Sequence, residues 1–404
     1  MKRGYVLFVS CVLLLLGVAV VDPAGTGVTV VQAQAAPQAP SGRGGRGGPA
    51  IVSPEIGADG RVTFRLYAPQ AGTVTVSGDI SLSLVPADDA TGGGSTPAVV
   101  MTKGADGVWT GTTIRPVRPG AWRYTFTVDG VATVDPRNTN LTHSQTAPSS
   151  MLYVPGDFSE TRNVPHGTIG RVRYVSKALG NVPREMYVYT PPGYERGDGR
   201  FPVLYLIHGG GDTALSWTTV GRAPDILDNL IAEGRAVPMI VVMPSGWTPS
   251  GGQVMTSDAS KDPFTRELLE DIIPFVESNY RTPATPDARA LGGLSMGGIQ
   301  TLNIGLTHLG TFRYLVVMSS GWVSEDDRQW FYRSQADRIP TYNDALKLFW
   351  WGWGETDIAR ENGLAVIETF RRQGVRIETL ETPGGHTWDN WRLYLHEVAP
   401  KLFR

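Results

Sequence analysis

Cysteine is nearly absent from this chain of 404 residues, in which Cys11 is the only one. A single thiol cannot form an intramolecular disulfide or supply a cluster of thiolate ligands to a metal. Cys11 also lies inside an apolar N-terminal segment that has the pattern of an export signal. These features exclude a disulfide scaffold, a thiol nucleophile and a cysteine-rich metal site in the mature protein.

Charge is scarce as well, because only 18% of the residues are charged and the formal net charge is −2. The two signs are mixed along the chain, without a basic stripe or an acidic tail. We therefore expect no nucleic-acid partner, and a partner that is neutral or weakly charged.

Residues 1–35 have the composition of an export signal. Lys2 and Arg3 precede an uncharged, mostly apolar run from Tyr5 to Val21, and Ala33-Gln34-Ala35 offers small residues at the cleavage positions. We predict a signal peptide over residues 1–35, a secreted or periplasmic protein, and no membrane attachment after cleavage. An uncleaved anchor is the alternative, since the apolar run is near the lower limit for crossing a bilayer.

Two changes of composition follow the export signal. Residues 36–50 consist mostly of Gly, Pro and small residues, which predicts a flexible linker. Residues 51–155 carry short segments of alternating apolar and polar residues between frequent turn signals, for example at 61–67 and 122–128. This pattern predicts a small immunoglobulin-like β-sandwich.

The chain from 156 to 404 has a different pattern. Continuous apolar runs at 202–207 and 239–243 are typical of strands that are buried on both faces. Amphipathic helices are predicted between such runs at about 224–234, 263–279 and 361–373. Alternating strands and helices predict an α/β fold with a mostly parallel sheet and right-handed crossovers.

A candidate nucleophile lies in Gly293-Leu294-Ser295-Met296-Gly297, which fits the pattern G-x-S-x-G. An apolar stretch precedes this motif and a helix-forming stretch follows it. In such an elbow the serine occupies a strained turn between strand and helix, and the glycines avoid clashes there. Ser295 is therefore the predicted nucleophile, and an ordinary turn at a helix entry is the alternative.

A nucleophilic serine needs a histidine base and an acid that orients the imidazole. In the α/β-hydrolase chain order the acid follows the nucleophile and the histidine comes last. His386 lies between a predicted strand and the last helix, which makes it the predicted base. Asp357, after the apolar strand 346–353, is the preferred acid, and Glu355 is the alternative. More distant alternatives for the acid are Asp326 and Asp327.

An oxyanion hole needs backbone N–H groups that are already oriented. The N–H of Met296, next to the nucleophile, is one predicted donor. The second is the N–H of Gly210 in His208-Gly209-Gly210-Gly211, a glycine loop directly after a predicted strand. His208 is assigned a structural role, and a flexible glycine turn is the alternative for the loop.

Tryptophans are frequent near these motifs and can stack on an aromatic acyl group or a sugar face. Trp217 and Trp388 are the predicted substrate-binding residues, with core packing as the alternative. Residues 323–345, rich in charge and aromatic side chains, are predicted to form one wall of the pocket. The predicted chemistry requires no metal and no other cofactor.

These motifs in this order resemble carbohydrate esterase family 1, which includes feruloyl and acetylxylan esterases. The chain is also similar to enterochelin esterases and to esterase D-type enzymes. The resemblance covers about residues 164–403 and rests on Val188–Tyr194, Tyr205–Gly211, Gly292–Gly298, Gly354–Asp357 and Gly384–Trp388. It implies an α/β-hydrolase fold with Ser295 as nucleophile, Asp357 as acid and His386 as base.

The N-terminal region is similar to the immunoglobulin-like modules of carbohydrate-binding module family 48. The similarity rests on Gly60–Pro69, Trp109, Trp122–Asp129 and Asp135-Pro136. Such modules precede family 1 esterase domains in secreted bacterial enzymes. The resemblance leaves two roles open, a glycan-binding module and a merely structural partner.

Together the resemblances imply a secreted serine esterase that hydrolyses feruloyl esters on plant cell-wall polysaccharide through an acyl-enzyme. The implied partner is an esterified polysaccharide or oligosaccharide. The alternatives are an acetylxylan esterase, a siderophore esterase and a general carboxylesterase. A non-catalytic glycan-binding protein with a relict hydrolase domain is the alternative from another class.

Overall fold

The computed structural model describes residues 50–86, 89–90, 98–249 and 255–404. The predicted signal peptide at 1–35 lies outside these residues, as does the predicted linker except for its last residue. In the described part of the chain, no helix is both long and apolar enough to span a membrane.

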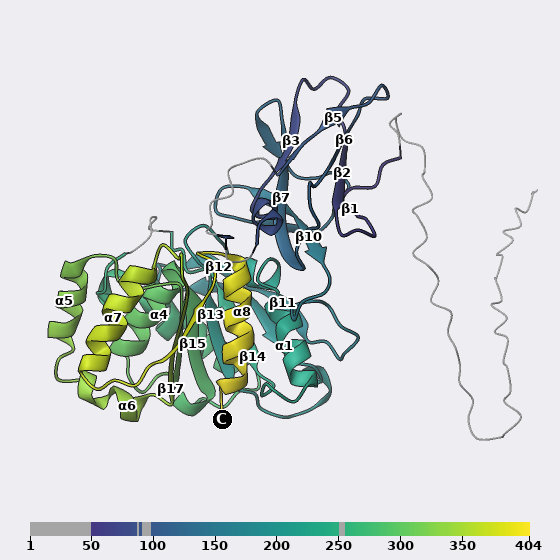
Figure 1. Ribbon diagram of the computed structural model, residues 1–404. Coiled ribbons are helices and arrows are strands. Elements are labelled where there is room, and N and C mark those ends of the chain that lie inside the picture. The colour runs from purple at the N-terminus through teal and green to yellow at the C-terminus, as the bar shows by residue number, and fades with distance from the viewer. Residues whose placement is uncertain (1–49, 87–88, 91–97, 250–254) are drawn as a thin grey trace, which may run out of the picture. The chain divides into compact units, whose positions relative to one another are not determined.

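The N-terminal β-sandwich, residues 50–154, consists of two antiparallel sheets (Figure 1). One sheet contains, in spatial order, β1 (Glu55–Ile56), β2 (Val62–Tyr67), β6 (Val108–Thr112) and β5 (Thr102–Lys103). The other contains β4 (Val99–Val100), β3 (Val74–Ser77), β7 (Gly120–Val128), β10 (Pro148–Val154) and β9 (Leu141–His143), and β8 (Val131–Thr133) pairs with β7. Alternate side chains of β2 and β7 share one apolar core between the sheets, as the period-two pattern predicts.

The remainder of the described chain is built on one eight-stranded sheet. Its strands are β11 (Thr168–Ser176), β12 (Val182–Thr190), β13 (Val203–Ile207), β14 (Ile240–Pro244), β15 (Arg289–Leu294), β16 (Tyr314–Met318), β17 (Leu348–Gly354) and β18 (Glu378–Thr382). The spatial order is β11-β12-β14-β13-β15-β16-β17-β18, and all pairs from β14 to β18 are parallel. The prediction of a mostly parallel sheet is therefore confirmed, while the antiparallel pair β11–β12 was not predicted.

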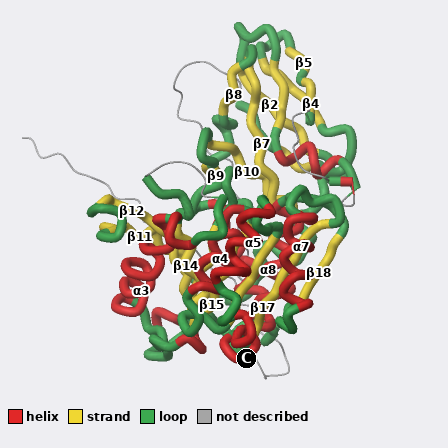
Figure 2. Tube along the Cα trace, turned by 90° about the vertical axis from the view of Figure 1, so that its left-hand side faces the viewer, coloured by secondary structure: helices red, strands yellow, loops and turns green. Residues whose placement is uncertain are grey.

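Helices cover both faces of this sheet (Figures 1 and 2). On one face, α1 (Ala223–Ala232) and α8 (Trp388–Val398) pack beside each other over one apolar cluster. The other face is covered by α2 (Pro263–Arg266), α3 (Ile273–Asn279), α4 (Met296–Thr307), α5 (Glu325–Ser334) and α7 (Arg360–Arg372). The short α6 (Tyr342–Ala345) precedes β17. Because both faces are buried, the central strands contain continuous apolar runs.

The sandwich and the eight-stranded sheet share part of their packing. Ala121 and Met151 of the sandwich belong to the apolar cluster beneath α1 and α8. The buried Arg392 of α8 donates from Nη1 to the carbonyls of Ala121 and Val220, each at 3.1 Å. The predicted domain boundary at 155/156 falls between β10 and β11, and the division into separate domains stays a prediction.

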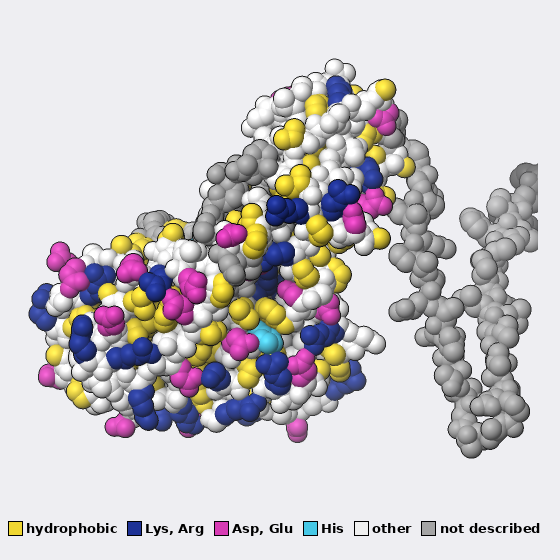
Figure 3. Space-filling view, viewed as in Figure 1, with side chains coloured by type: hydrophobic (Ala, Val, Ile, Leu, Met, Phe, Trp, Pro, Cys, Tyr) yellow, Lys and Arg dark blue, Asp and Glu magenta, His cyan; other side chains and the backbone are white. Residues whose placement is uncertain are grey.

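The visible surface carries Lys and Arg side chains interspersed with Asp and Glu (Figure 3). This distribution agrees with the formal net charge of −2.

Candidate active site

Ser295 occupies a sharp turn between β15 and α4. Its backbone has φ 51° and ψ −116°, a conformation that a non-glycine residue adopts only when its surroundings hold it there. The Ser295 N–H donates to the carbonyl of Met318 in the neighbouring β16 at 2.9 Å. The turn is therefore fixed to the sheet at the position that a nucleophile elbow requires.

The glycines around Ser295 are required by close backbone approach. A Cβ on Gly293 would come within 2.4 Å of the Gly297 backbone, and one on Gly297 within 2.7 Å of the His208 carbonyl oxygen. A Cβ on Gly298 would lie 2.4 Å from that of Ser320. These contacts explain why the sequence has glycine on both sides of the serine.

His386 and Asp357 form the next part of the site. The His386 Nδ1 lies 2.8 Å from Asp357 Oδ1, and the Asp357 side chain has no exposed surface. Burial would raise the pKa of this carboxyl group, but the hydrogen bond with His386 and the attraction to that ring lower the pKa below its ordinary value. Asp357 is thus a buried anion that is hydrogen-bonded to the imidazole.

The alternative acids lie elsewhere. Glu355 is exposed at the start of the turn that follows β17. Asp327 is bound at the start of α5, where its carboxylate accepts from Thr256 and from the N–H of Ser257. The structure therefore brings Asp357 to His386.

The loop after β13 lies beside Ser295. A Cβ on Gly209 would meet the Cβ of Ser295 at 3.4 Å. His208 Nε2 accepts from the N–H of Gly246 at 3.1 Å, so its proton is on Nδ1, which donates to the Gly209 carbonyl at 2.8 Å. In a trans peptide the N–H points opposite to the C=O, so the Gly210 N–H points away from His208.

The two predicted oxyanion donors make no hydrogen bond to another described residue. Within the described residues, the N–H groups of Gly210 and Met296 have no hydrogen-bond partner. Met296 is also the first residue of α4, where the helix dipole adds positive potential. Both groups therefore remain available to a developing negative charge near Ser295.

Two cavities meet at Ser295 and His386. The larger, with a volume of about 500 Å³, is lined by Trp388 and by residues of the β-sandwich, including Asp79 and Arg123. The smaller, about 130 Å³, is lined by apolar side chains including Met255, Val323 and Ile358. A substrate with one polar and one apolar arm could place its central bond between them.

The two predicted substrate-binding tryptophans have different positions. Trp388 lines the larger cavity. Trp217 has no exposed surface and packs against Trp388, with the centroids of the two rings 5.1 Å apart. Trp217 donates to the Ile207 carbonyl at 3.2 Å, so in this structure it supports the cavity wall rather than lining it. Of residues 323–345, Val323 alone lines either of the two cavities at Ser295. The prediction that this segment forms a wall of the pocket is therefore wrong for its other residues.

Sequence reasoning missed the contribution of the N-terminal sandwich to this site. Asp79, Trp122, Arg123 and Ser149 line the larger cavity. Trp122 and Arg123 lie in the segment that resembles carbohydrate-binding modules, but neither that resemblance nor the sequence around Asp79 and Ser149 points to the cavity at Ser295. Only the packing of the sandwich against the α8 side of the sheet brings them near Ser295.

The strand order, the elbow and the His386–Asp357 pair together define an α/β-hydrolase. A family model described as "Putative esterase" matches residues 176–402. The chain belongs to this esterase family.

A relative from Xylanibacter ruminicola, endo-1,4-beta-xylanase/feruloyl esterase, is 32% identical over 362 residues. The alignment covers 87% of this chain and 46% of the relative. The chain thus spans less than half the length of this curated relative.

Solved structures show the same fold. The feruloyl esterase module from Clostridium thermocellum, complexed with sinapinate, is 26% identical with a TM-score of 0.53, over 62% of this chain and 93% of that one. The enterobactin esterase from Shigella flexneri is 17% identical with a TM-score of 0.60, over 85% of this chain and 93% of that one. The second likeness concerns the fold alone.

Proposed function

We propose that this protein is a secreted serine esterase that hydrolyses feruloyl esters carried by plant cell-wall polysaccharide. The observation that carries the proposal is the strained Ser295 on the same two cavities as His386, whose ring is bound to the buried Asp357. The names of the Xylanibacter relative and of the Clostridium module support the feruloyl group and the xylan. The apolar cavity and Trp388 support an aromatic acyl group.

The reaction proceeds through an acyl-enzyme. His386 takes the proton of Ser295, and the serine oxygen attacks the ester carbonyl carbon. The C–O bond to the sugar then breaks, and His386 gives its proton to the leaving hydroxyl group. A water molecule, deprotonated by His386, then attacks the acyl-enzyme. The bond from the acyl carbon to the Ser295 oxygen breaks, His386 returns the proton to that oxygen, and the carboxylic acid is released.

The negative charge of each tetrahedral intermediate lies on the former carbonyl oxygen. The free N–H groups of Gly210 and Met296 are the proposed donors to it. Removing one such donor typically slows an enzyme by about 10²–10³-fold. Asp357 stabilises the imidazolium that forms on His386 in the same step.

Ser295→Ala tests this proposal. We expect wild type to hydrolyse methyl ferulate and to release ferulate from feruloylated xylan, and Ser295→Ala to lose on the order of 10³-fold or more of kcat. Acetylated xylan, p-nitrophenyl acetate and enterobactin, assayed in parallel, distinguish the other esterase classes. Undiminished hydrolysis by Ser295→Ala would remove the proposed nucleophile, and no hydrolysis of any ester by wild type would favour a relict hydrolase.

A further inference from the structure

The turn that carries Gly210 is held from two sides. Inside the hydrolase region, His208 holds the Gly209 carbonyl, which also accepts from the N–H of Asp212 at 3.1 Å. This closes residues 209–212 into a β-turn with Gly210 at its second position. Ser216 of the same region also donates from its hydroxyl to Asp212 Oδ1 at 3.4 Å. The remaining attachments of the turn come from the N-terminal β-sandwich.

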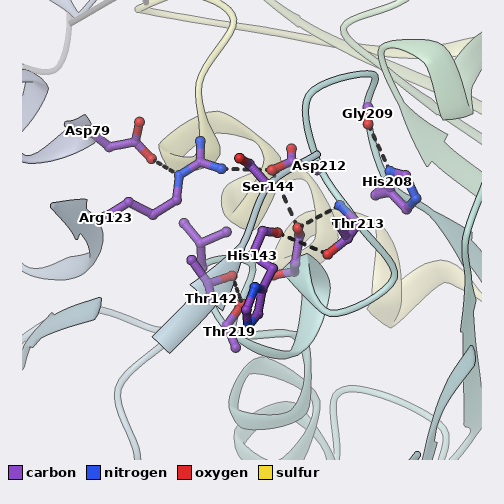
Figure 4. Close-up of polar contacts among 12 residues, drawn as sticks. Asp79, Arg123, Thr142, His143, Ser144, His208, Gly209, Asp212, Thr213 and Thr219 are labelled. Carbon is purple, nitrogen blue, oxygen red and sulfur yellow. Dashed lines mark hydrogen bonds and ion pairs between the residues drawn. The ribbon is translucent and has the colours of Figure 1, made fainter. Parts of the chain in front are cut away.

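The principal attachment is an ion pair with Arg123 of β7 (Figure 4). Arg123 Nη1 donates to Asp212 Oδ1 at 2.7 Å, while its Nε donates to Asp79 Oδ2 at 2.5 Å. The Asp212 side chain is 7% exposed, so water screens this pair weakly. Burial would lower the pKa of Arg123, but the two carboxylates outweigh it and hold the guanidinium charged.

The turn between β9 and β10 supplies a second set of contacts. The backbone N–H of Gln145 donates to the Gly211 carbonyl at 3.1 Å, and its side chain donates to the Asp212 carbonyl at 2.9 Å. Thr213, the next residue of the hydrolase loop, donates to the His143 carbonyl at 2.9 Å. Residues 211–213 are therefore attached to the sandwich at three successive positions.

We propose that contacts from the β-sandwich hold the oxyanion hole in position, and that Arg123 is a positioning residue for the Gly210 N–H. Arg123 is fixed by Asp79 within its own region, so it transmits the position of the sandwich to Asp212, two residues from the donor. A small displacement of a donor weakens stabilisation of the transition state more than binding of the ground state. The inference rests on the proposed esterase function.

This role differs from glycan binding in what it predicts for small substrates. A glycan-binding module would change KM on feruloylated xylan and leave methyl ferulate unaffected. A positioning role changes kcat on methyl ferulate itself, because the defect lies at the carbonyl oxygen. The two roles are therefore separated by one pair of substrates.

The test uses the full chain with Arg123→Gln and a matched control, Arg65→Gln. Arg65 is similarly exposed (29% against 22%) and pairs with Glu55 at 2.7 Å on the same sandwich, but it does not line the cavity at Ser295. We expect Arg123→Gln to lower kcat on methyl ferulate about 10- to 100-fold, with KM changed less than threefold. Arg65→Gln should stay within twofold of wild type.

Two further measurements keep the proposal falsifiable if Arg123→Gln folds poorly. Gln145 is exposed, so Gln145→Ala should fold normally and still lower kcat about threefold. A phenylboronic acid, which forms a tetrahedral adduct with an active-site serine, should bind Gln145→Ala more weakly in proportion to the fall in kcat. Ferulate, the planar product, should bind with unchanged Kd.

Wild-type kcat on methyl ferulate in folded Arg123→Gln and Gln145→Ala would overturn the inference while leaving the esterase proposal intact. An increase confined to KM on feruloylated xylan would assign the sandwich to glycan binding instead. Failure of the esterase proposal has a different signature, which is an inactive wild type or an active Ser295→Ala.

Discussion

At the scale of single residues, the site depends on a few side chains whose environments fix their protonation. Asp357 stays ionised because the His386 ring compensates for its burial. His208 stays neutral because it is completely enclosed. His208 therefore acts as a neutral hydrogen-bonding group that holds the Gly209 carbonyl and the Gly246 N–H.

Asp357→Asn should separate the role of the acid from that of its neighbours. The amide fills the same space but favours the wrong tautomer of His386, so kcat should fall on the order of 10³–10⁴-fold. Glu355→Gln is the matched control and should keep wild-type kcat, since Glu355 is exposed. Steady-state kinetics with methyl ferulate checks both, and equal losses in the two variants would contradict the assignment of the acid.

His208 predicts a pH dependence of stability. Burial lowers the pKa of His208 from 6.5 to about 4 in the folded protein. The unfolded chain therefore takes up this proton at higher pH than the folded protein, so the free energy of unfolding falls as the pH drops through this window. At pH 5 the loss attributable to His208 is about 2 kcal/mol.

Urea unfolding at pH 7 and pH 5 checks this prediction. His208→Gln cannot take up the proton. Between pH 7 and pH 5 its free energy of unfolding should therefore fall by about 2 kcal/mol less than that of wild type. The variant should also be less stable at pH 7, because the bond to the Gly209 carbonyl is lost. Identical pH dependence in both proteins would show that another group is responsible.

At the scale of elements, the residues of the proposed active site lie where strands end. Ser295 follows β15, His208 follows β13 and Asp357 follows β17, all at the carboxyl ends of parallel strands. This is the edge of an open α/β sheet at which ligands bind. Each loop is short and tied to a neighbour, as the bond from Ser295 to Met318 illustrates.

The nucleophile turn and most of the parallel sheet can be predicted from the sequence, because the residue patterns that mark them are local. The glycines that flank Ser295 and the apolar strands reveal the elbow and the sheet directly. The edge pair β11–β12 escaped prediction because its exposed alternation resembles the preceding sandwich strands. Arg123 and Asp212 lie 89 positions apart, and no local pattern marks a pair that only tertiary packing creates.

At the scale of the whole molecule, the sandwich and the hydrolase sheet share a core and a cavity. Arg392 is 1% exposed and satisfies carbonyls from both regions, while Ala121 and Met151 join the cluster under α8. Leaving a buried carbonyl without its hydrogen-bond donor costs about 1–3 kcal/mol. The interface therefore couples the stability of the two regions.

Calorimetry should show one cooperative unfolding transition for wild type, since the two regions share an apolar cluster and the hydrogen bonds of Arg392. Arg392→Met should lower Tm and broaden or split the transition, because it leaves the carbonyls of Ala121 and Val220 without donors. Arg65→Gln, on the far side of the sandwich core, should leave the single transition intact. Two well-separated transitions in wild type would contradict this coupling.

The most direct test of the central claim is to trap and locate the acyl-enzyme. Methyl ferulate is mixed with the protein, the reaction is quenched in acid within milliseconds, and the modified peptide is identified by mass spectrometry. The account predicts one feruloyl group on Ser295 in wild type and none in Ser295→Ala or His386→Gln, because each variant lacks a group needed to form the acyl-enzyme. A feruloyl group on any other residue, or its formation at the wild-type rate in His386→Gln, would contradict it.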